Sequence, residues 1–192
     1  MRPPLAAAPA LAAALLACAS SKESSCPGQA VATLTFAAAL PDPAAPPASF
    51  PPGLPATACQ GGTPPGGYAP LVPASVAFTA ILALDPAGTG AALCRTDALA
   101  SPLLGERTGE TFDVSLISTG AVLAGCDPNC GVVLTERVHG TLATDPATGA
   151  LSFSGYLWDH AEEVASPEES CGGCVPPCDA VYDLTGTAPA PH

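Results

Sequence analysis

Apolar and polar residues alternate along several stretches in the second half of the chain. The clearest case is residues 75–84, SVAFTAILAL, where every second residue is apolar: Val76, Phe78, Ala80, Leu82 and Leu84. This is the period of a β-strand that packs one face against a core. The turn-forming sequence DPAGTG follows, and residues 91–95 are expected to return as the second strand. The pattern therefore predicts an antiparallel hairpin.

A second hairpin is predicted around the related turn DPATG at residues 145–149, between strands at residues 138–142 and 151–158. In both turns the Asp side chain accepts backbone hydrogen bonds, Pro presets φ, and Gly supplies a left-handed residue. Further strands are predicted at residues 112–118, 121–124, 132–138 and 180–184. Residues 31–40, VATLTFAAAL, are a candidate strand because β-branched residues recur in them.

Residues 41–73 interrupt this regularity with eleven prolines and five glycines. Proline lacks a backbone donor and fixes φ, so this stretch cannot supply an inner strand or a helix interior. We interpret it as an extended linker.

No window shows a sustained helical stripe, and turn signals come about every ten residues. We therefore predict an all-β fold, a disulfide-stapled antiparallel β-sandwich or small barrel of about six to eight strands. The predicted organisation is a signal peptide at 1–17, a polar tether at 18–30, the candidate strand and Pro/Gly-rich linker at 31–74, the β domain at 75–187, and a flexible tail at 188–192.

The N-terminal segment has one positive residue, Arg2, and an apolar run that ends in Leu15-Leu16-Ala17-Cys18. This run is too short to span a bilayer as a helix and is typical of an export signal. It resembles the signal peptides of bacterial lipoproteins, whose lipobox places Leu, a small or apolar residue, and Ala or Gly before a lipidated Cys. The resemblance implies cleavage before Cys18, lipidation of Cys18 and a membrane anchor.

Ordinary secretory cleavage, which would discard Cys18 with the signal, is the alternative reading of the same residues. Both readings place the mature protein outside the cytoplasm. In some lipoproteins an Asp directly after the lipidated Cys retains the protein at the inner membrane. This chain has Ala19 at that position, so the lipoprotein resemblance implies a location in the cell envelope at the outer membrane.

Eight cysteines remain after Cys18: Cys26, Cys59, Cys94, Cys126, Cys130, Cys171, Cys174 and Cys178. An even number in an exported chain predicts disulfides. Sequence alone does not select the pairing, except that Cys126 and Cys130 bracket a turn-forming Asp-Pro-Asn and are expected to bond to each other.

Charge excludes one class of partner. Without Arg2, four basic residues remain against 17 acids, a formal net charge of −13. A surface with this charge repels nucleic acid. No Lys or Arg follows Arg137, so the C-terminal part of the chain presents an acidic face that favours solubility.

The sequence offers ligands for two kinds of metal site. His160 with Cys171, Cys174 and Cys178 has the ligand types of a zinc site, but exported cysteines are expected to form disulfides. Calcium would use carboxylates, yet the chain has no EF-hand pattern. No metal is therefore predicted, and the candidates that remain are His160, Asp159, Glu162 and Glu163.

Signals for catalysis are weak. The chain has no Gly-x-Ser-x-Gly elbow, Asp159-His160 is a single polar pair at a strand end, and His139 falls on the outer face of its predicted strand. Trp158, beside Tyr156, is expected to be a core or rim aromatic that would also suit carbohydrate or peptide contact. We expect no catalytic residue, no cofactor and no enzymatic activity.

The sequence therefore predicts a membrane-anchored, exported lipoprotein with a non-catalytic structural or recognition β domain. Its expected partners are the membrane, through the lipid anchor, and a protein or carbohydrate. The alternative is a ligand-binding or Ca/Zn-binding module centred on residues 156–179.

Overall fold

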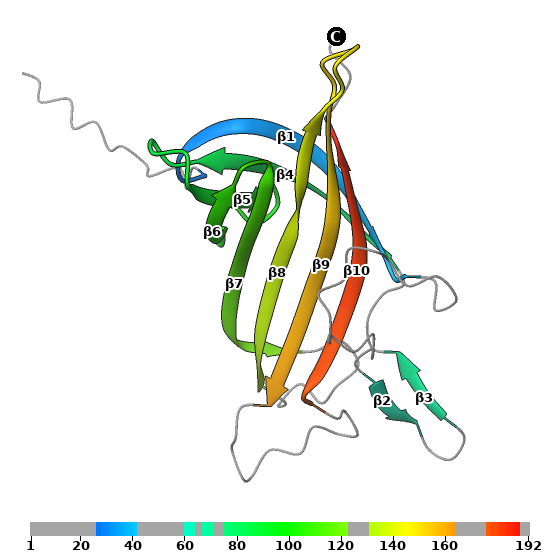
Figure 1. The fold of residues 1–192 in the computed structure, drawn as a ribbon. Coiled ribbons are helices and arrows are strands. Elements are labelled where there is room, and N and C mark those ends of the chain that lie inside the picture. Colours follow the sequence, from blue (N-terminus) through cyan, green and yellow to red (C-terminus); the bar gives the residue numbers. More distant parts are fainter. Residues whose placement is uncertain are drawn as a thin grey trace, which may run out of the picture.

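The computed structural model describes residues 26–41, 60–63, 67–70, 75–122, 131–163 and 176–188. Figure 1 shows their ten β-strands: β1 (Gln29–Ala39), β2 (Gln60–Thr63), β3 (Gly67–Pro70), β4 (Ser75–Leu84), β5 (Gly90–Arg95), β6 (Leu103–Thr108), β7 (Thr111–Val122), β8 (Gly131–Thr144), β9 (Leu151–Glu163) and β10 (Cys178–Thr187). Within these ranges no helix is long and apolar enough to cross a membrane.

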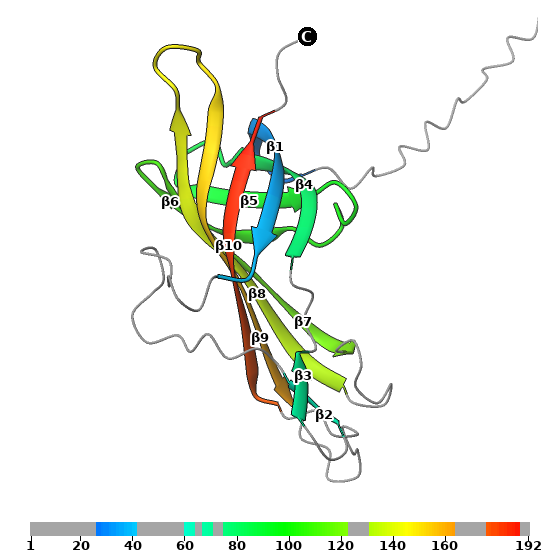
Figure 2. The same ribbon diagram turned by 90° about the vertical axis from the view of Figure 1, so that its right-hand side faces the viewer.

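Eight of the strands close into one barrel, in the order β1-β10-β9-β8-β7-β6-β5-β4, and β1 pairs with β4 to complete it. All neighbours are antiparallel, and Figure 2 shows β1 lying between β10 and β4. Apart from the long connection between β1 and β4, each strand pairs with its neighbours in sequence, which is the up-and-down arrangement. The strands β2 and β3 form a separate two-stranded sheet.

The predicted all-β, antiparallel fold is confirmed, and of the two predicted architectures the molecule adopts the barrel, with eight strands. The strand predicted at residues 75–84 matches β4, and the candidate strand at 31–40 corresponds to β1. Strand β1, which begins at Gln29, closes the barrel by pairing with both β10 and β4.

Two pairs of predicted segments each form a single strand, and one strand was not predicted. The segments predicted at 132–138 and 138–142 are one strand, β8. The segments predicted at 112–118 and 121–124 are joined in β7 across a bulge at Gly120, which has a positive φ of 74°; residues 123–124 lie outside the described ranges. Strand β6 was not predicted, because its inward positions carry Leu103, Gly105 and Arg107, of which only the first is a large apolar residue.

Large side chains fill the middle of the barrel. Phe36 of β1 is fully buried, stacks on Phe78 of β4 with ring centroids 5.1 Å apart, and meets the edge of Phe153 at 5.4 Å. Such offset and edge-to-face pairs are the favoured aromatic geometries. The other large buried residues include Tyr182, Phe112, Leu34, Leu82, Leu93, Leu103 and Leu184. The interior at this level is a packed core.

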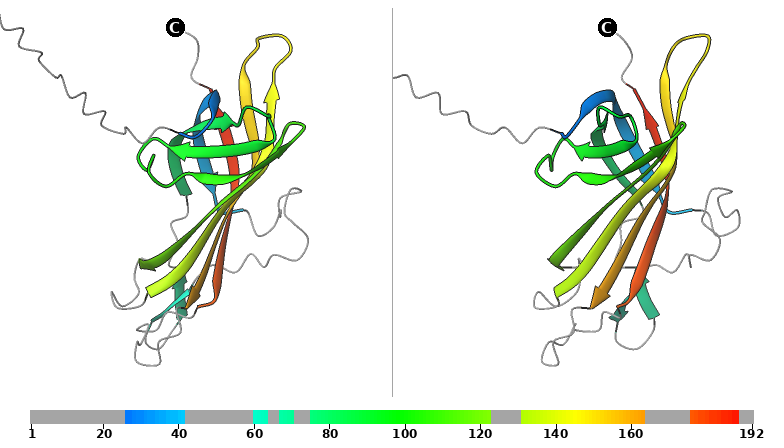
Figure 3. Two further views of the ribbon diagram at one scale, coloured as in Figure 1. Left: turned by 90° about the vertical axis from the view of Figure 1, so that its left-hand side faces the viewer. Right: turned by 60° about the vertical axis from the view of Figure 1, so that its left-hand side comes forward.

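Four strands continue beyond the barrel as a sheet. Strand β6 pairs with β7 no further than Leu104 opposite Ser115, and β1 pairs with β10 only from Asp183 onward. Beyond these points β7, β8, β9 and β10 pair only among themselves in the described residues, and Figure 3 shows them projecting past the closed part. We call this part the sheet extension.

The two predicted hairpin turns are confirmed. The Oδ1 atom of Asp145 accepts hydrogen bonds from the backbone N–H groups of Ala147 at 2.7 Å and Thr148 at 3.2 Å. Asp85 accepts one from the N–H of Thr89 at 3.0 Å. Gly149 has a positive φ of 71°, as the turn requires.

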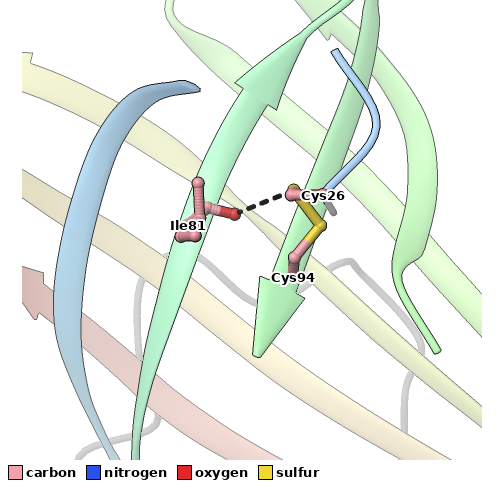
Figure 4. Close-up of a disulfide and its surroundings, with 3 residues drawn as sticks. All are labelled: Cys26, Ile81 and Cys94. Atoms are coloured by element: carbon pink, nitrogen blue, oxygen red, sulfur yellow. Dashed lines mark hydrogen bonds between the residues drawn. A yellow bond between two sulfur atoms is a disulfide. The ribbon is translucent and has the colours of Figure 1, made fainter. Parts of the chain in front are cut away.

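A disulfide joins Cys26, three residues before β1, to Cys94 of β5. Figure 4 shows this bond beside Ile81 of β4, whose carbonyl oxygen lies 3.9 Å from the Cys26 Sγ. A bonded sulfur has no proton to donate, so this contact is one of packing. Cys94 is fully buried on the outer side of the barrel wall, with Ala83 and Ala92. The disulfide ties the start of the barrel to β5, the strand on the far side of β4.

Candidate functional site

The metal candidates from the sequence do not form one group, because they alternate along β9. His160 and Glu162 share the outer face with Trp158, whereas Asp159 shares the inner face with the core residue Leu157. Glu163 ends β9, and its side chain lies outside the described part of the chain. Strand geometry therefore places the sheet itself between Asp159 and the other two candidates.

On the outer face, His160 bridges two carboxylates. Its Nδ1 lies 2.8 Å from Oδ1 of Asp179 on β10, and its Nε2 lies 3.1 Å from Oε1 of Glu162. Burial acts to lower the pKa of His160, but the hydrogen bonds to Asp179 and Glu162 outweigh it and raise the pKa above the usual value. The protonated ring, with both nitrogens donating, fits this arrangement.

Trp158 belongs to the same outer-face cluster. Its Nε1–H donates to Oδ1 of Asp179 at 2.8 Å, and its ring lies 5.4 Å from the His160 ring. One carboxylate oxygen of Asp179 thus serves two aromatic side chains on β9. We call Trp158, His160, Glu162 and Asp179 the outer-face cluster. Sequence reasoning missed Asp179, because its closeness to His160 depends on the β9–β10 register, in which these two residues are partners.

A second polar group lies on the outer face of β7 and β8. Arg137 binds Asp113 through two hydrogen bonds, with its Nε 2.7 Å from Oδ1 and its Nη2 on Oδ2. The hydrogen bond from Arg137 lowers the pKa of Asp113. His139 stacks on Tyr156 with ring centroids 5.2 Å apart. The outer face of the sheet thus carries Trp158, which is the only Trp of the chain, together with Arg137, His139 and His160.

Chemically, these groups are suited to contact more than to reaction. Both His160 nitrogens face carboxylates, so a metal ion would have to displace an ion pair to reach either one. In the described ranges, no three His, Cys, Asp or Glu side chains are arranged to hold a metal ion. Partly exposed Trp and Arg side chains, such as those of Trp158 and Arg137, are among the residue types that dominate the energetics of protein interfaces.

The inner face of the sheet carries a third polar group, which is more buried and lies at the end of the barrel core. Glu136 of β8 lies opposite Asp159 of β9 in the strand register. Arg95, the last residue of β5, lies over the Phe78 ring at 5.0 Å and interacts electrostatically with both carboxyl groups. Burial raises the pKa of Glu136, and it raises the pKa of Asp159 to about 7. Nothing in the sequence marked Glu136 or Arg95 as members of such a group.

Of the predicted disulfide cysteines, Cys26 and Cys94 are bonded to each other, and Cys178 at the start of β10 is also disulfide-bonded. The other predicted disulfide cysteines, including the expected pair Cys126 and Cys130, lie outside the described residues, as does the lipidation candidate Cys18.

Comparison with known protein families, with curated proteins and with solved structures finds no match to this chain.

Proposed function

We propose that this chain is an exported lipoprotein, cleaved before Cys18 and lipidated there, whose barrel serves a non-catalytic structural or recognition role at the surface of the outer membrane. The observation that carries the proposal is the disulfide between Cys26 and Cys94. Disulfides of this kind persist in oxidising compartments and are rare in the cytosol. The bond therefore supports the export that the N-terminal segment predicts.

The same disulfide relates the proposed anchor to the barrel. Eight residue steps separate Cys18 from Cys26, a span of at most about 28 Å for an extended chain. Cys26 lies at the barrel end where β1 begins opposite the end of β4, with Gln29 paired to Leu84. With lipid on Cys18, this end would lie near the membrane and the sheet extension would project away from it.

A recognition role is supported by where the polar groups lie. The middle of the barrel is filled by side chains such as Phe36 and Tyr182, whereas the outer-face cluster is partly exposed. A role through contact at the surface of the sheet accounts for both features. The acidic charge keeps such a domain soluble beside a membrane.

The test is an intact mass of the full chain, expressed with its N-terminal segment in bacteria and extracted from the membrane fraction. We expect the mass of residues 18–192 plus acyl chains, and thiols that alkylate only after reduction. A Cys18→Ser variant should lose both the acyl mass and the cleavage. Recovery of the native chain from the cytosol, with residues 1–17 attached and thiols that alkylate without reductant, would contradict the proposal.

The second candidate, a Ca/Zn-binding module at residues 156–179, is favoured by one observation, the closeness of His160, Glu162 and Asp179. Against it, Asp159 lies on the inner face and cannot join these three, and the described residues hold no group of three side chains arranged for a metal ion. Calorimetry of the oxidised protein with CaCl₂ and with ZnCl₂ separates the two candidates. Saturable heat that disappears in a His160→Gln variant would favour the metal module.

A further inference from the structure

Two acidic residues lie opposite each other on the inner face of the sheet, where the packed core gives way to the sheet extension. Glu136 and Asp159 are directly opposite in the β8–β9 register. Each lies two residues along its strand from a buried core residue, Val138 in β8 and Leu157 in β9. Because side chains alternate between faces, both carboxyl groups are on the inner face. We call these two residues the carboxyl pair.

The surroundings offer the carboxyl pair little compensation. On its neighbours β7 and β10 the register partners are Leu116 and Ala180, which carry no charge. The Oδ1 atom of Asp159 is buried and has no hydrogen-bond partner among the described residues. Buried polar atoms in native proteins are almost always bonded, so an exception calls for a physical explanation.

Among the described residues, the other titratable groups that act on the pair are Arg95 and Asp97 at the end of β5 and Tyr182 on β10. The two charge-assisted hydrogen bonds of the Arg95 guanidinium, at 3.1 and 3.2 Å, both go to Asp97. No ion pair within 4.0 Å joins Arg95 to Glu136 or Asp159 in the described structure. One cation, already shared with Asp97, faces two inward carboxyl groups.

Like charges placed directly opposite across a strand pair are destabilising, and the cost rises as water is excluded. When two carboxyl groups lie opposite each other in such a site, ionisation of both is unfavourable, and one of them keeps its proton to a higher pH. We propose that Asp159 holds a proton in the closed barrel, and that release of this proton to water, which places two negative charges opposite each other, loosens β8 from β9 where the sheet extension begins.

The pKa shifts of Asp159 and of the neighbouring Tyr182 are consistent with this arrangement. Burial, and then the charge of Glu136, raise the pKa of Asp159 from 3.8 to about 7, while Arg95 acts in the opposite direction. Burial, and then the charge of Asp159, raise the pKa of Tyr182 to about 12, so that Tyr182 stays neutral.

The sign of the pH effect follows from linkage. A carboxyl group with a raised folded-state pKa gives the folded protein an extra proton between the unfolded and folded pKa values. Its stabilisation is therefore complete below about pH 4 and is lost as the pH rises to about 7. The device favours the closed form in acid and loosens it in neutral to alkaline solution.

The direct test is NMR titration of the Asp159 side-chain carboxyl carbon in the oxidised full chain. We expect an apparent pKa near 7 in the wild type, and a lower value in Glu136→Gln because the neighbouring charge is gone. An Asp159 pKa near 4 in the wild type, or one unchanged by Glu136→Gln, would overturn the proposal. The wild-type titration does not depend on any variant folding.

Hydrogen exchange tests the loosening. Amide protection in β8 and β9 near the pair, corrected for intrinsic exchange, should fall at least about tenfold between pH 5 and pH 8 in the wild type. His160 on the opposite face also titrates in this range, so the variants are compared in a His160→Gln background. There the protection should still fall, whereas the double variant Asp159→Asn/His160→Gln should keep it. Equal protection at the two pH values in His160→Gln, or an equal fall in the double variant, would refute the device.

Discussion

Gly155 of β9 lies directly opposite Gly140 of β8, and a Cβ atom on Gly155 would come within 2.5 Å of the Gly140 Cα. The same Cβ would meet the carbonyl oxygen of His139 at 2.0 Å, a distance that real side chains do not reach. These obstacles are backbone atoms, so no rotamer change can relieve them. The close approach of β8 and β9 at this level therefore requires glycine.

We predict that Gly155→Ala destabilises the barrel by about 1–3 kcal/mol, because the two strands must move apart. Urea denaturation measures the change. The matched control is Gly131→Ala at the start of β8, where an added Cβ has no atom within 4 Å. If both variants unfold at the same urea concentration as the wild type, the close approach is wrong.

The disulfide gives a second prediction. Cys26 and Cys94 are 68 residues apart, so their bond closes a long loop in the unfolded chain. Replacing both by Ala should cost about 4 kcal/mol by the loop-entropy estimate and should lower the melting temperature. Thermal unfolding of the oxidised proteins checks this. A melting temperature equal to that of the wild type would show that the bond is absent or contributes no stability.

Arg137 and Asp113 form a third test. Their fork geometry needs a guanidinium, so Arg137→Lys should weaken the pair, with a loss of about 0.5–1 kcal/mol because the pair is partly exposed. The hydrogen bond from Arg137 lowers the pKa of Asp113, so its stabilisation is present above the unfolded pKa and is lost as the pH falls through the folded pKa. Urea unfolding at neutral and acidic pH should show the wild type and the variant converging in acid. A difference that persists at low pH would contradict this reading.

His160 provides a prediction about its two partners. The Asp179 side chain is 15 % exposed and that of Glu162 is 64 %, so water screens Glu162 more. We expect Asp179→Asn to lower the pKa of His160 more than Glu162→Gln does, as followed by NMR of the ring. Because the folded-state pKa is raised, the stability from His160 is lost as the pH rises through it. Equal pKa changes in the two variants would contradict the geometry.

Sequence reasoning located elements where local pattern and structure agree, and β4 is the clearest case. The inner positions of β4 are all apolar, so the alternation is visible along the chain alone. Strand β6 is held by its neighbours β5 and β7, and its own inner face includes Gly105 and Arg107. Its pairing comes from the rest of the barrel, and no local signal reports it.

The candidate site was located only in part, for the same reason. His160 and Glu162 are neighbours because they are two residues apart on a strand, which sequence can predict. Asp179 and Glu136 approach β9 from β10 and β8, and their contacts depend on register. The sequence therefore identified the cluster residues on β9, and it could not identify their partners on β8 and β10.

The seam of the barrel joins strands from opposite ends of the described chain, since β1 pairs with β10. During synthesis β1 is made first and β10 last. Until the final strand exists, β1 and β9 each keep a row of unpaired backbone groups that can join other chains. A shortened product lacking residues 178–187 would keep both rows exposed and would tend to aggregate, so the pairing of β10 with both β1 and β9 is the step that makes the barrel self-contained.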